Sequence, residues 1–287
     1  MAARLRALLA EPRLHVMPCC WDALSARLIE RAGFPLSFMS GFAVSAARLA
    51  LPDTQLISYT EMLDTGRALC GAVSIPVIGD ADTGHGNALN VKRTITGYAQ
   101  AGFAAAMIED QLAPKRCGHI RGKDVVSRGE ALARIRAAVD ARDEGAGILI
   151  LARTDAAAVH GLEEAIARAR AFRDAGADIL FVEAPTSEAE LERVARALEG
   201  TPLMANLVEG GDTPLLPPQR LQELGFRIAA YPLTLLSVAV KAVEDALVHM
   251  RAGEHPAESE RVSFAALREL VGFPAYDEAA ERYKADD

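Results

Sequence analysis

Acidic, basic and amide side chains stand directly after several short apolar runs of this chain. Asp80 and Asp82 follow one such run, and their two-residue spacing would place both side chains on one side of an extended backbone. A DxD pair alone is more often a turn cap. Similar positions after other runs favour a shared site, because they carry Glu109, Arg153, Glu183 and Asn206. Carboxylates without histidine or cysteine suit a hard cation, so we predict Mg²⁺, with Mn²⁺ as the alternative ion.

Arg153 closes the apolar run ILILA (148–152). A guanidinium in such surroundings needs an anion, and its two parallel N–H donors fit a carboxylate. That carboxylate could belong to a substrate, or to Glu183 or Asp155 of the chain itself, and both arrangements can hold at once. Arg153 is therefore predicted to orient an acidic substrate.

The stretch APKRCGHIRGK (113–123) places Cys117 among five basic side chains and two glycines. Nearby positive charge favours thiolate over thiol, so Cys117 is predicted to act as a general acid/base. The glycines would let this stretch close over the site as a lid whose charges face an anionic substrate. The alternatives are a solvated basic loop and a buried, inert cysteine. Nucleic acid is not an expected partner, because no aromatic residues alternate with the basic ones and the net charge is −8.

Short apolar runs must position these residues. They are continuous rather than alternating, as expected for parallel strands that are buried on both faces. The runs lie at 14–18, 35–40, 74–80, 104–110, 147–153, 178–184, 202–206 and 227–232. Helical patterns such as 161–176 separate them, and several of these patterns end in glycine. The alternation predicts an α/β fold, a (βα)₈ TIM barrel, whose strands all end at one mouth.

No linker or low-complexity stretch divides the 287 residues. We therefore expect one domain over 1–287, with 252–287 as a C-terminal helical extension that could pack on a neighbouring subunit. No apolar run approaches the ~20 residues that span a bilayer, and the N-terminus has no signal-peptide pattern, so no membrane partner is expected. Four cysteines without a CxxC pair fit a reducing, cytoplasmic setting.

Short motifs along the chain resemble those of the isocitrate lyase and phosphoenolpyruvate mutase superfamily. They are SGFAVSA (40–46), LPD (51–53), DADTGHGN (80–87), IEDQ (108–111), KRCGH (115–119), ARTDA (152–156), VEAP (182–185), ANLVEGG (205–211) and YPLTLL (231–236). The resemblance implies a (βα)₈ barrel with Mg²⁺ in its mouth and a small dicarboxylate as substrate. It also implies exchange of a C-terminal helix between subunits and a homotetramer, a dimer of helix-swapped dimers.

The same resemblance assigns roles by position. Asp80 and Asp82 resemble the metal aspartates, with Asp53 and Glu109 as outer carboxylates around the metal and its waters. The segment that holds the keto-acid end of the substrate corresponds to Ser40, Gly41 and Phe42. The substrate-orienting residues correspond to Arg153, Glu183 and Asn206, and the lid to Cys117, Gly118 and His119.

Three positions separate this chain from the 2-methylisocitrate lyases, which it also resembles. Ser237 and Phe264 stand where those enzymes carry two arginines for a third carboxylate, and Phe38 stands where they carry a tyrosine. A third carboxylate left unpaired would be costly, so a smaller dicarboxylate is expected. The phosphorus-transferring mutases of the superfamily carry a different lid without the KRCGH cysteine, so Cys117 favours carbon–carbon cleavage over phosphorus transfer. The motifs are most similar to the branch of 2,3-dimethylmalate lyase and petal death protein.

We therefore expect a carbon–carbon lyase of the oxo-acid-lyase type. It would cleave a 2-alkylmalate, such as 2,3-dimethylmalate, by retro-aldol chemistry to a 2-keto acid such as pyruvate and a carboxylate. Cys117 would protonate the departing carbon. The sequence does not identify the base that takes the hydroxyl proton: His85 and His119 are candidates by position, and the alternative for His85 is a turn residue beside the metal. The alternatives are oxaloacetate hydrolysis or decarboxylation at the same site and, further away, 2-methylisocitrate or phosphonopyruvate chemistry. A barrel that only binds or regulates is disfavoured, because the acidic, thiol and guanidinium groups are all present.

Overall fold

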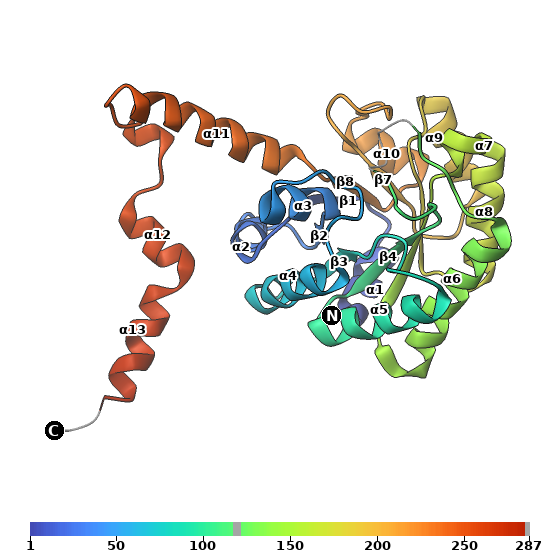
Figure 1. Cartoon of the computed structure of the whole chain (residues 1–287), viewed down its shortest axis with the longest axis horizontal. Coiled ribbons are helices and arrows are strands. Elements are labelled where there is room, and N and C mark those ends of the chain that lie inside the picture. Colours follow the sequence, from blue (N-terminus) through green and yellow to red (C-terminus); the bar gives the residue numbers. More distant parts are fainter. Residues whose placement is uncertain (117–121, 285–287) are drawn as a thin grey trace. The chain divides into compact units, whose positions relative to one another are not determined.

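Eight parallel strands form the centre of the first part of the chain (Figure 1). The computed structural model describes residues 1–116 and 122–284. The strands are β1 (His15–Cys20), β2 (Ser37–Met39), β3 (Val77–Asp80), β4 (Ala105–Glu109), β5 (Leu149–Thr154), β6 (Ile179–Val182), β7 (Met204–Asn206) and β8 (Ile228–Tyr231). Each strand overlaps one of the predicted runs.

The strands follow the order β6-β5-β4-β3-β2-β1-β8-β7, with parallel pairing throughout. A parallel bridge between Leu180 of β6 and Leu203, just before β7, brings the two edges of the sheet together. The sheet is therefore a nearly closed barrel, and the predicted TIM-like fold is confirmed.

Helices alternate with the strands along the chain. They are α1 (Ala2–Ala10), α2 (Ala23–Arg31), α3 (Gly41–Leu49), α4 (Tyr59–Ala72), α5 (Ala88–Ala101), α6 (Arg128–Ala141), α7 (Ala156–His160), α8 (Leu162–Asp174), α9 (Glu188–Ala197), α10 (Pro218–Leu224), α11 (Thr234–Arg251), α12 (Phe264–Val271) and α13 (Phe273–Arg282). A π-helical turn, η1 (Arg142–Ala146), follows α6, and a 3₁₀ turn, η2 (Glu258–Glu260), precedes α12.

Local sequence explains where these helices begin and end. Ser58 caps α4, and the Glu61 carboxylate accepts the Ser58 N–H at 2.8 Å in return. At the end of α5, Gly102 takes a left-handed φ of 102° and turns the chain into β4. The amphipathic pattern predicted over 161–176 is α8, which buries Ala165, Ile166, Ala169 and Phe172.

Strand side chains alternate between two apolar cores. In β4, Ile108 belongs to the core shared with the surrounding helices, whereas Met107 lies in the core inside the barrel. Leu5 and Leu9 of α1 join the inner core. Helix α1 therefore fills the N-terminal end of the barrel, and the C-terminal ends of the strands are left to carry the polar residues.

The chain divides into two compact units, Met1–Leu235 and Leu236–Asp287. The second unit holds most of α11 together with α12 and α13, and it exposes several large apolar side chains: Val240, Val243, Leu247, Met250, Phe264, Phe273 and Tyr276. The single domain over 1–287 with an extension at 252–287, and the exchange of a helix between subunits, stay predictions. Among the helices in the described ranges, none combines the length and the apolar character that crossing a membrane requires.

Candidate active site

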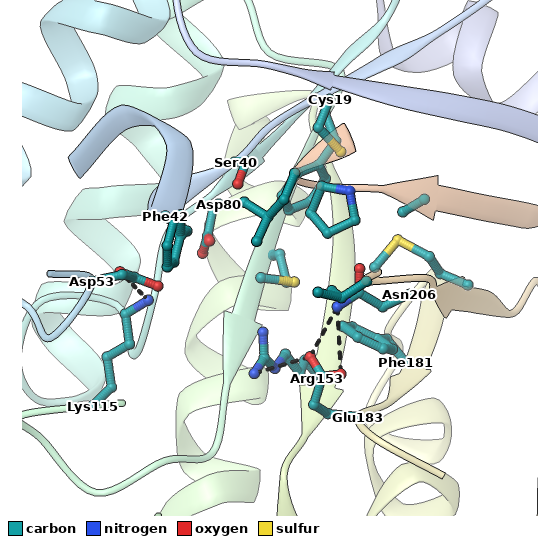
Figure 2. Close-up of a pocket in the computed structure, with 17 residues that line it drawn as sticks. Cys19, Ser40, Phe42, Asp53, Asp80, Lys115, Arg153, Phe181, Glu183 and Asn206 are labelled. Carbon is teal, nitrogen blue, oxygen red and sulfur yellow. Dashed lines mark hydrogen bonds and ion pairs between the residues drawn. The ribbon is translucent and has the colours of Figure 1, made fainter. Parts of the chain in front are cut away.

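A pocket at the C-terminal ends of the strands gathers most of the predicted site residues (Figure 2). The predicted residues that line it are Ser40, Phe42, Asp53, Asp80, Arg153, Glu183 and Asn206. Much of the remaining wall is apolar and comprises Cys19, Phe38, Met107, Phe181, Met204, Val208, Ala230, Pro232 and Leu233. Asp82 and Glu109 do not line the pocket, and each is only 1% exposed.

Asp80, the last residue of β3, is held by three neighbours. The Tyr98 hydroxyl donates to its carbonyl at 2.7 Å, and its carboxylate accepts the N–H of Gly41 at 3.1 Å and that of Asp82 at 3.0 Å. A Cβ at position 41 would lie 2.6 Å from Asp80 Oδ2, so any side chain there would displace this carboxylate. Burial raises the pKa of Asp80 to about 6, and the nearby Asp82 charge adds to the rise.

Asp82 departs from the predicted geometry. Strand β3 ends at Asp80, and Asp82 adopts a left-handed backbone with φ of 50°. The prediction that both carboxylates lie along one extended segment is therefore wrong. Aspartate tolerates this conformation better than most residues, because its short side chain can bond locally.

Lys115 lies between two of the predicted metal-site carboxylates. Its Nζ is 2.8 Å from Asp82 Oδ1 and 2.7 Å from Asp53 Oδ1, and all three side chains are at most 6% exposed. The ammonium that was predicted to face a substrate is thus engaged by the chain's own carboxylates. Burial alone would lower the pKa of Lys115, but Asp82 and Asp53 outweigh it and hold the pKa well above its ordinary value.

The two partners of Lys115 respond differently. Burial raises the pKa of Asp53 although Lys115 opposes the rise. Burial also acts to raise the pKa of Asp82, but there Lys115 prevails and the pKa is lowered. Because the two ion-pair distances differ by only 0.1 Å (2.8 against 2.7 Å), we treat the ammonium as shared by both carboxylates.

Arg153, in β5, is surrounded by three carboxylates. Its Nε and Nη2 donate to the two oxygens of Asp155 at 2.8 and 2.9 Å. The same guanidinium lies 3.2 Å from Glu109 Oε2 and 3.1 Å from Glu183 Oε2, and Asn206 Nδ2 donates to Glu183 at 3.4 Å. Both partners considered from the sequence are therefore present, and Figure 2 shows Arg153, Glu183 and Asn206 grouped at one wall.

Lys123 joins this group, and the sequence interpretation gave it no such role. Its Nζ lies 2.9 Å from Asp155 Oδ1. Burial would raise the pKa of Asp155, but Arg153 and Lys123 outweigh it and lower the pKa to about 2. The basic stretch signalled that lysines lie near the mouth, but not which carboxylates they reach. Position in sequence alone could not reveal the contact, because it depends on how the stretch folds.

Two glutamines fix the start of the basic stretch. Gln55 Oε1 accepts the N–H of Lys115 at 2.9 Å. Gln111 accepts the N–H of Arg116 and donates to its carbonyl, both at 2.9 Å. The predicted lid residues Cys117, Gly118 and His119 lie outside the described residues, so their roles stay predictions.

Two other predicted residues occupy distinct positions. Ser40 caps α3, accepting the N–H of Ala43 at 3.3 Å, so the N-terminus of this helix faces the pocket beside Phe42. His85 does not line the pocket. Its ring packs edge-on against Tyr59 at 5.5 Å, and burial lowers its pKa although Asp82 opposes that shift.

The donor set fits Mg²⁺. Buried Asp82 Oδ2 and Glu109 Oε1 accept no hydrogen bond from the described residues. Asp53 Oδ1 and Asp82 Oδ1 contact the Lys115 ammonium, and Glu109 Oε2 lies 3.2 Å from Arg153 Nε. Among the described residues, no group of three or more His, Cys, Asp or Glu side chains is placed so that it could hold a metal ion. Mg²⁺ does not require one, because it takes one or two carboxylates and keeps several waters. The oxygen-rich site at Asp80 and Asp82 is consistent with that coordination.

The chain is similar in sequence and in structure to known proteins. A sequence model of the phosphoenolpyruvate phosphomutase family matches residues 5–251. Over 284 residues the chain is 41% identical to a 2,3-dimethylmalate lyase of Eubacterium barkeri, covering 98% of both chains. It is also 46% identical over 244 residues to a probable 2-methylisocitrate lyase 2 of Corynebacterium glutamicum, covering 85% of this chain and 78% of that one.

A solved structure of similar shape is that of an oxaloacetate acetylhydrolase in complex with the inhibitor 3,3-difluorooxalacetate. It matches with a TM-score of 0.95 and 36% identity over 99% of this chain and 98% of that one. The names of the two sequence relatives agree with the predicted enzyme class, a carbon–carbon lyase.

Proposed function

The chain belongs to the phosphoenolpyruvate mutase and isocitrate lyase superfamily, and on that premise we propose that it is a Mg²⁺-dependent carbon–carbon lyase. Its proposed substrate is a 2-hydroxy dicarboxylate of the 2-alkylmalate type, cleaved to a 2-keto acid such as pyruvate and a carboxylate. The residues that line the pocket support an alkyl-substituted dicarboxylate as the substrate. Of its described residues only Lys115 and Arg153 are cationic, and both are paired with carboxylates. An apolar wall suits an alkyl substituent better than a third carboxylate.

The chain's own groups would bind the keto-acid end of the substrate. The first amides of α3, beside Ser40, present N–H donors of the kind that bind anions at helix N-termini. Arg153 lines the same pocket, and its fork is held in a fixed orientation by Asp155. Asn206 can donate to a substrate oxygen while Glu183 fixes its amide. The apolar wall, which includes Phe38, Phe181 and Met204, would receive the alkyl group.

Cleavage would begin with loss of the C2 hydroxyl proton to a base, for which His119 is the candidate that remains, because His85 does not line the pocket. The C2–C3 bond then breaks, the C2 oxygen becomes the keto group, and the electron pair of the broken bond stays on C3 of the departing carboxylate. Cys117 would protonate that carbon, with Gly118 and His119 in the lid. When bound at Asp80 and Asp82, with Asp53 and Glu109 as outer carboxylates, Mg²⁺ supplies stabilisation of negative charge on the substrate oxygens.

Oxaloacetate hydrolysis is the second candidate, because a solved oxaloacetate acetylhydrolase matches this chain with a TM-score of 0.95. Oxaloacetate has the same two carboxylates and a C2 oxygen, so the same groups could bind it. 2-Methylisocitrate is less well matched despite the 46% identical relative, because Ser237 and Phe264 cannot pair with a third carboxylate.

We also propose a cytoplasmic homotetramer, a dimer of helix-swapped dimers. The support is the run of exposed apolar side chains in the second unit, among them Val243, Leu247 and Phe264. Exposed apolar side chains that recur along helices are typical of a protein–protein contact.

Product analysis distinguishes the candidates. The purified protein is incubated with Mg²⁺ and either 2,3-dimethylmalate stereoisomers or oxaloacetate, and the products are followed by proton NMR. Propionate with pyruvate, lost on adding a chelator, supports the alkylmalate lyase. Acetate and oxalate from oxaloacetate, with dimethylmalate intact, would support the hydrolase instead.

A matched pair of variants tests the thiol. Cys117→Ser should lower kcat at least about a hundredfold, because a serine hydroxyl is a far weaker acid than the thiol. Cys70→Ser, on α4 outside the pocket wall, should retain activity. Equal activity of the two variants would remove Cys117 from the reaction.

A further inference from the structure

Lys115 is an unusual cation for a basic surface stretch, because it is buried. The residue is only 3% exposed, and its ammonium contacts Asp53 and Asp82 at 2.7 and 2.8 Å. Lysines at surfaces normally keep the charged head in water. An ammonium taken out of water must be compensated by fixed anions, and here two carboxylates serve that purpose.

The backbone at this position is fixed independently of the side chain. Gln55 accepts the Lys115 N–H at 2.9 Å and donates to Thr83 Oγ1 at 2.7 Å. Thr83 and Asp82 belong to the same turn, so Gln55 links the lysine to the turn that carries one of its carboxylate partners. The backbone and the ammonium of Lys115 are therefore both held in place beside the carboxylates.

We propose that Lys115 is a resident cation of the metal site, which holds Asp53 and Asp82 in place and limits the affinity of the site for a divalent ion. The three carboxylates of Asp53, Asp80 and Asp82 with one ammonium carry a formal charge of −2, which a single divalent ion neutralises. Without the ammonium the formal charge would be −3. This inference rests on the proposed metal site at Asp80 and Asp82.

Charge repulsion sets the direction of the expected effect. An ammonium within hydrogen-bond distance of Asp82 lies within a few ångströms of any ion that Asp82 binds, and the two cations repel each other. Removing the ammonium should therefore tighten divalent ion binding, roughly tenfold or more. A lysine that only kept the turn folded would have the opposite effect, because its loss would disorder the ligands and weaken binding.

Lys123 offers a matched control on the other side of the same stretch. It is also a lysine with a side chain only 4% exposed, but its ammonium contacts Asp155, 2.9 Å away, which is not a proposed metal ligand. Lys123→Met removes the same charge and the same length of side chain from a different carboxylate. Lys115→Arg keeps the charge at the proposed position.

The experiment measures Mn²⁺ binding at pH 8 by the loss of the free-ion electron paramagnetic resonance signal. Wild type is expected to bind one ion, and Lys115→Met to bind it about tenfold more tightly or better. Lys115→Arg and Lys123→Met are expected to stay within about threefold of wild type. Folding is followed in parallel by thermal unfolding with and without Mn²⁺, because the metal-free Lys115→Met protein should be less stable than wild type and gain more from the ion.

Each outcome either supports or overturns the proposed role of Lys115. Unchanged or weaker Mn²⁺ binding by folded Lys115→Met overturns it and leaves the proposed metal site standing. Equal tightening by Lys123→Met also overturns it, since any lost charge would then suffice. If neither wild type nor Lys115→Met binds the ion, the proposed metal site itself is wrong, and the resident cation with it. A Lys115→Met protein that folds only with Mn²⁺, while Lys123→Met folds without it, supports the inference.

Discussion

The two ends of the barrel are built from opposite kinds of contact. At the N-terminal end, Leu5 and Leu9 of α1 are buried in the inner core, and Arg4 ties the helix to Ser74 O at 2.7 Å. At the C-terminal end, carboxylates are buried around Lys115 and Arg153, and two of their oxygens, Asp82 Oδ2 and Glu109 Oε1, accept no hydrogen bond from the described residues.

The N-terminal end of the barrel contributes stability, and the C-terminal end provides the groups for chemistry. Apolar burial at the N-terminal end stabilises the fold without a bound ion or substrate. Buried like charges at the other end cost stability, which is tolerated where a substrate or ion is to be bound. Substitutions at the N-terminal end should therefore change unfolding more than activity, and substitutions at the C-terminal end the reverse.

Asp80→Asn should show the largest effect. The variant keeps the shape of the side chain but removes the charge that the proposed metal site needs. We expect kcat/KM for dimethylmalate to fall at least about a thousandfold, about 4 kcal/mol in transition-state stabilisation. Steady-state kinetics with saturating Mg²⁺ measure it. A variant within tenfold of wild type would contradict the assignment of chemistry to this end.

Leu5→Ala tests the opposite end. Truncating a fully buried leucine should lower the free energy of unfolding by about 2–4 kcal/mol, with kcat/KM nearly unchanged below the unfolding transition. Urea denaturation of the variant measures the loss. Leu8→Ala, at a partly exposed position of the same helix, should cost clearly less. Equal losses would mean that burial in the barrel core does not set the effect.

Stability should also depend on pH through Asp80. Its pKa is about 6 in the folded protein, compared with an ordinary 3.8, so the unfolded chain releases this proton at lower pH than the folded one does. Wild type should therefore lose stability relative to Asp80→Asn as pH rises from about 4 to about 6, with the difference constant above. Denaturation of the metal-free proteins should show a change of about 1–3 kcal/mol across that window. A difference that is independent of pH would refute this.

Tyr98→Phe should give the smallest effect. The variant removes the hydroxyl that donates to the Asp80 carbonyl at 2.7 Å, while the ring can keep its stacking on Phe103 at a centroid distance of 4.8 Å. We expect a loss of about 1 kcal/mol in unfolding free energy and Mn²⁺ binding weakened a few-fold. Mn²⁺ affinity that is unchanged would show that this bond serves packing alone.

The barrel could be predicted from the sequence because its signals are local. Continuous apolar runs mark strands buried on both faces, and a glycine such as Gly102 closes the helix before the next run. The convergence of Asp80, Arg153 and Asn206 could also be predicted from the sequence, because the C-terminal ends of barrel strands meet at one mouth.

Contacts made by the connecting segments could not be predicted in the same way. The left-handed turn at Asp82 replaces the extended geometry that its spacing indicated. Lys115 contacts Asp82 and Lys123 contacts Asp155, which lie far from them in the sequence, and no periodicity encodes such contacts. These two lysines show that basic residues beside an acidic pocket can belong to the protein's own charge balance.

Cleavage of 2,3-dimethylmalate in D₂O with Mg²⁺, followed by NMR of the propionate, reports directly on the proposed retro-aldol step. Retro-aldol cleavage leaves an electron pair on C3 of the substrate, which must take up one solvent-derived proton to become C2 of propionate. We expect pyruvate and propionate in equal amounts, with one deuterium at C2 of propionate. Dimethylmalate that stays intact, while oxaloacetate is converted to acetate and oxalate, would contradict this expectation.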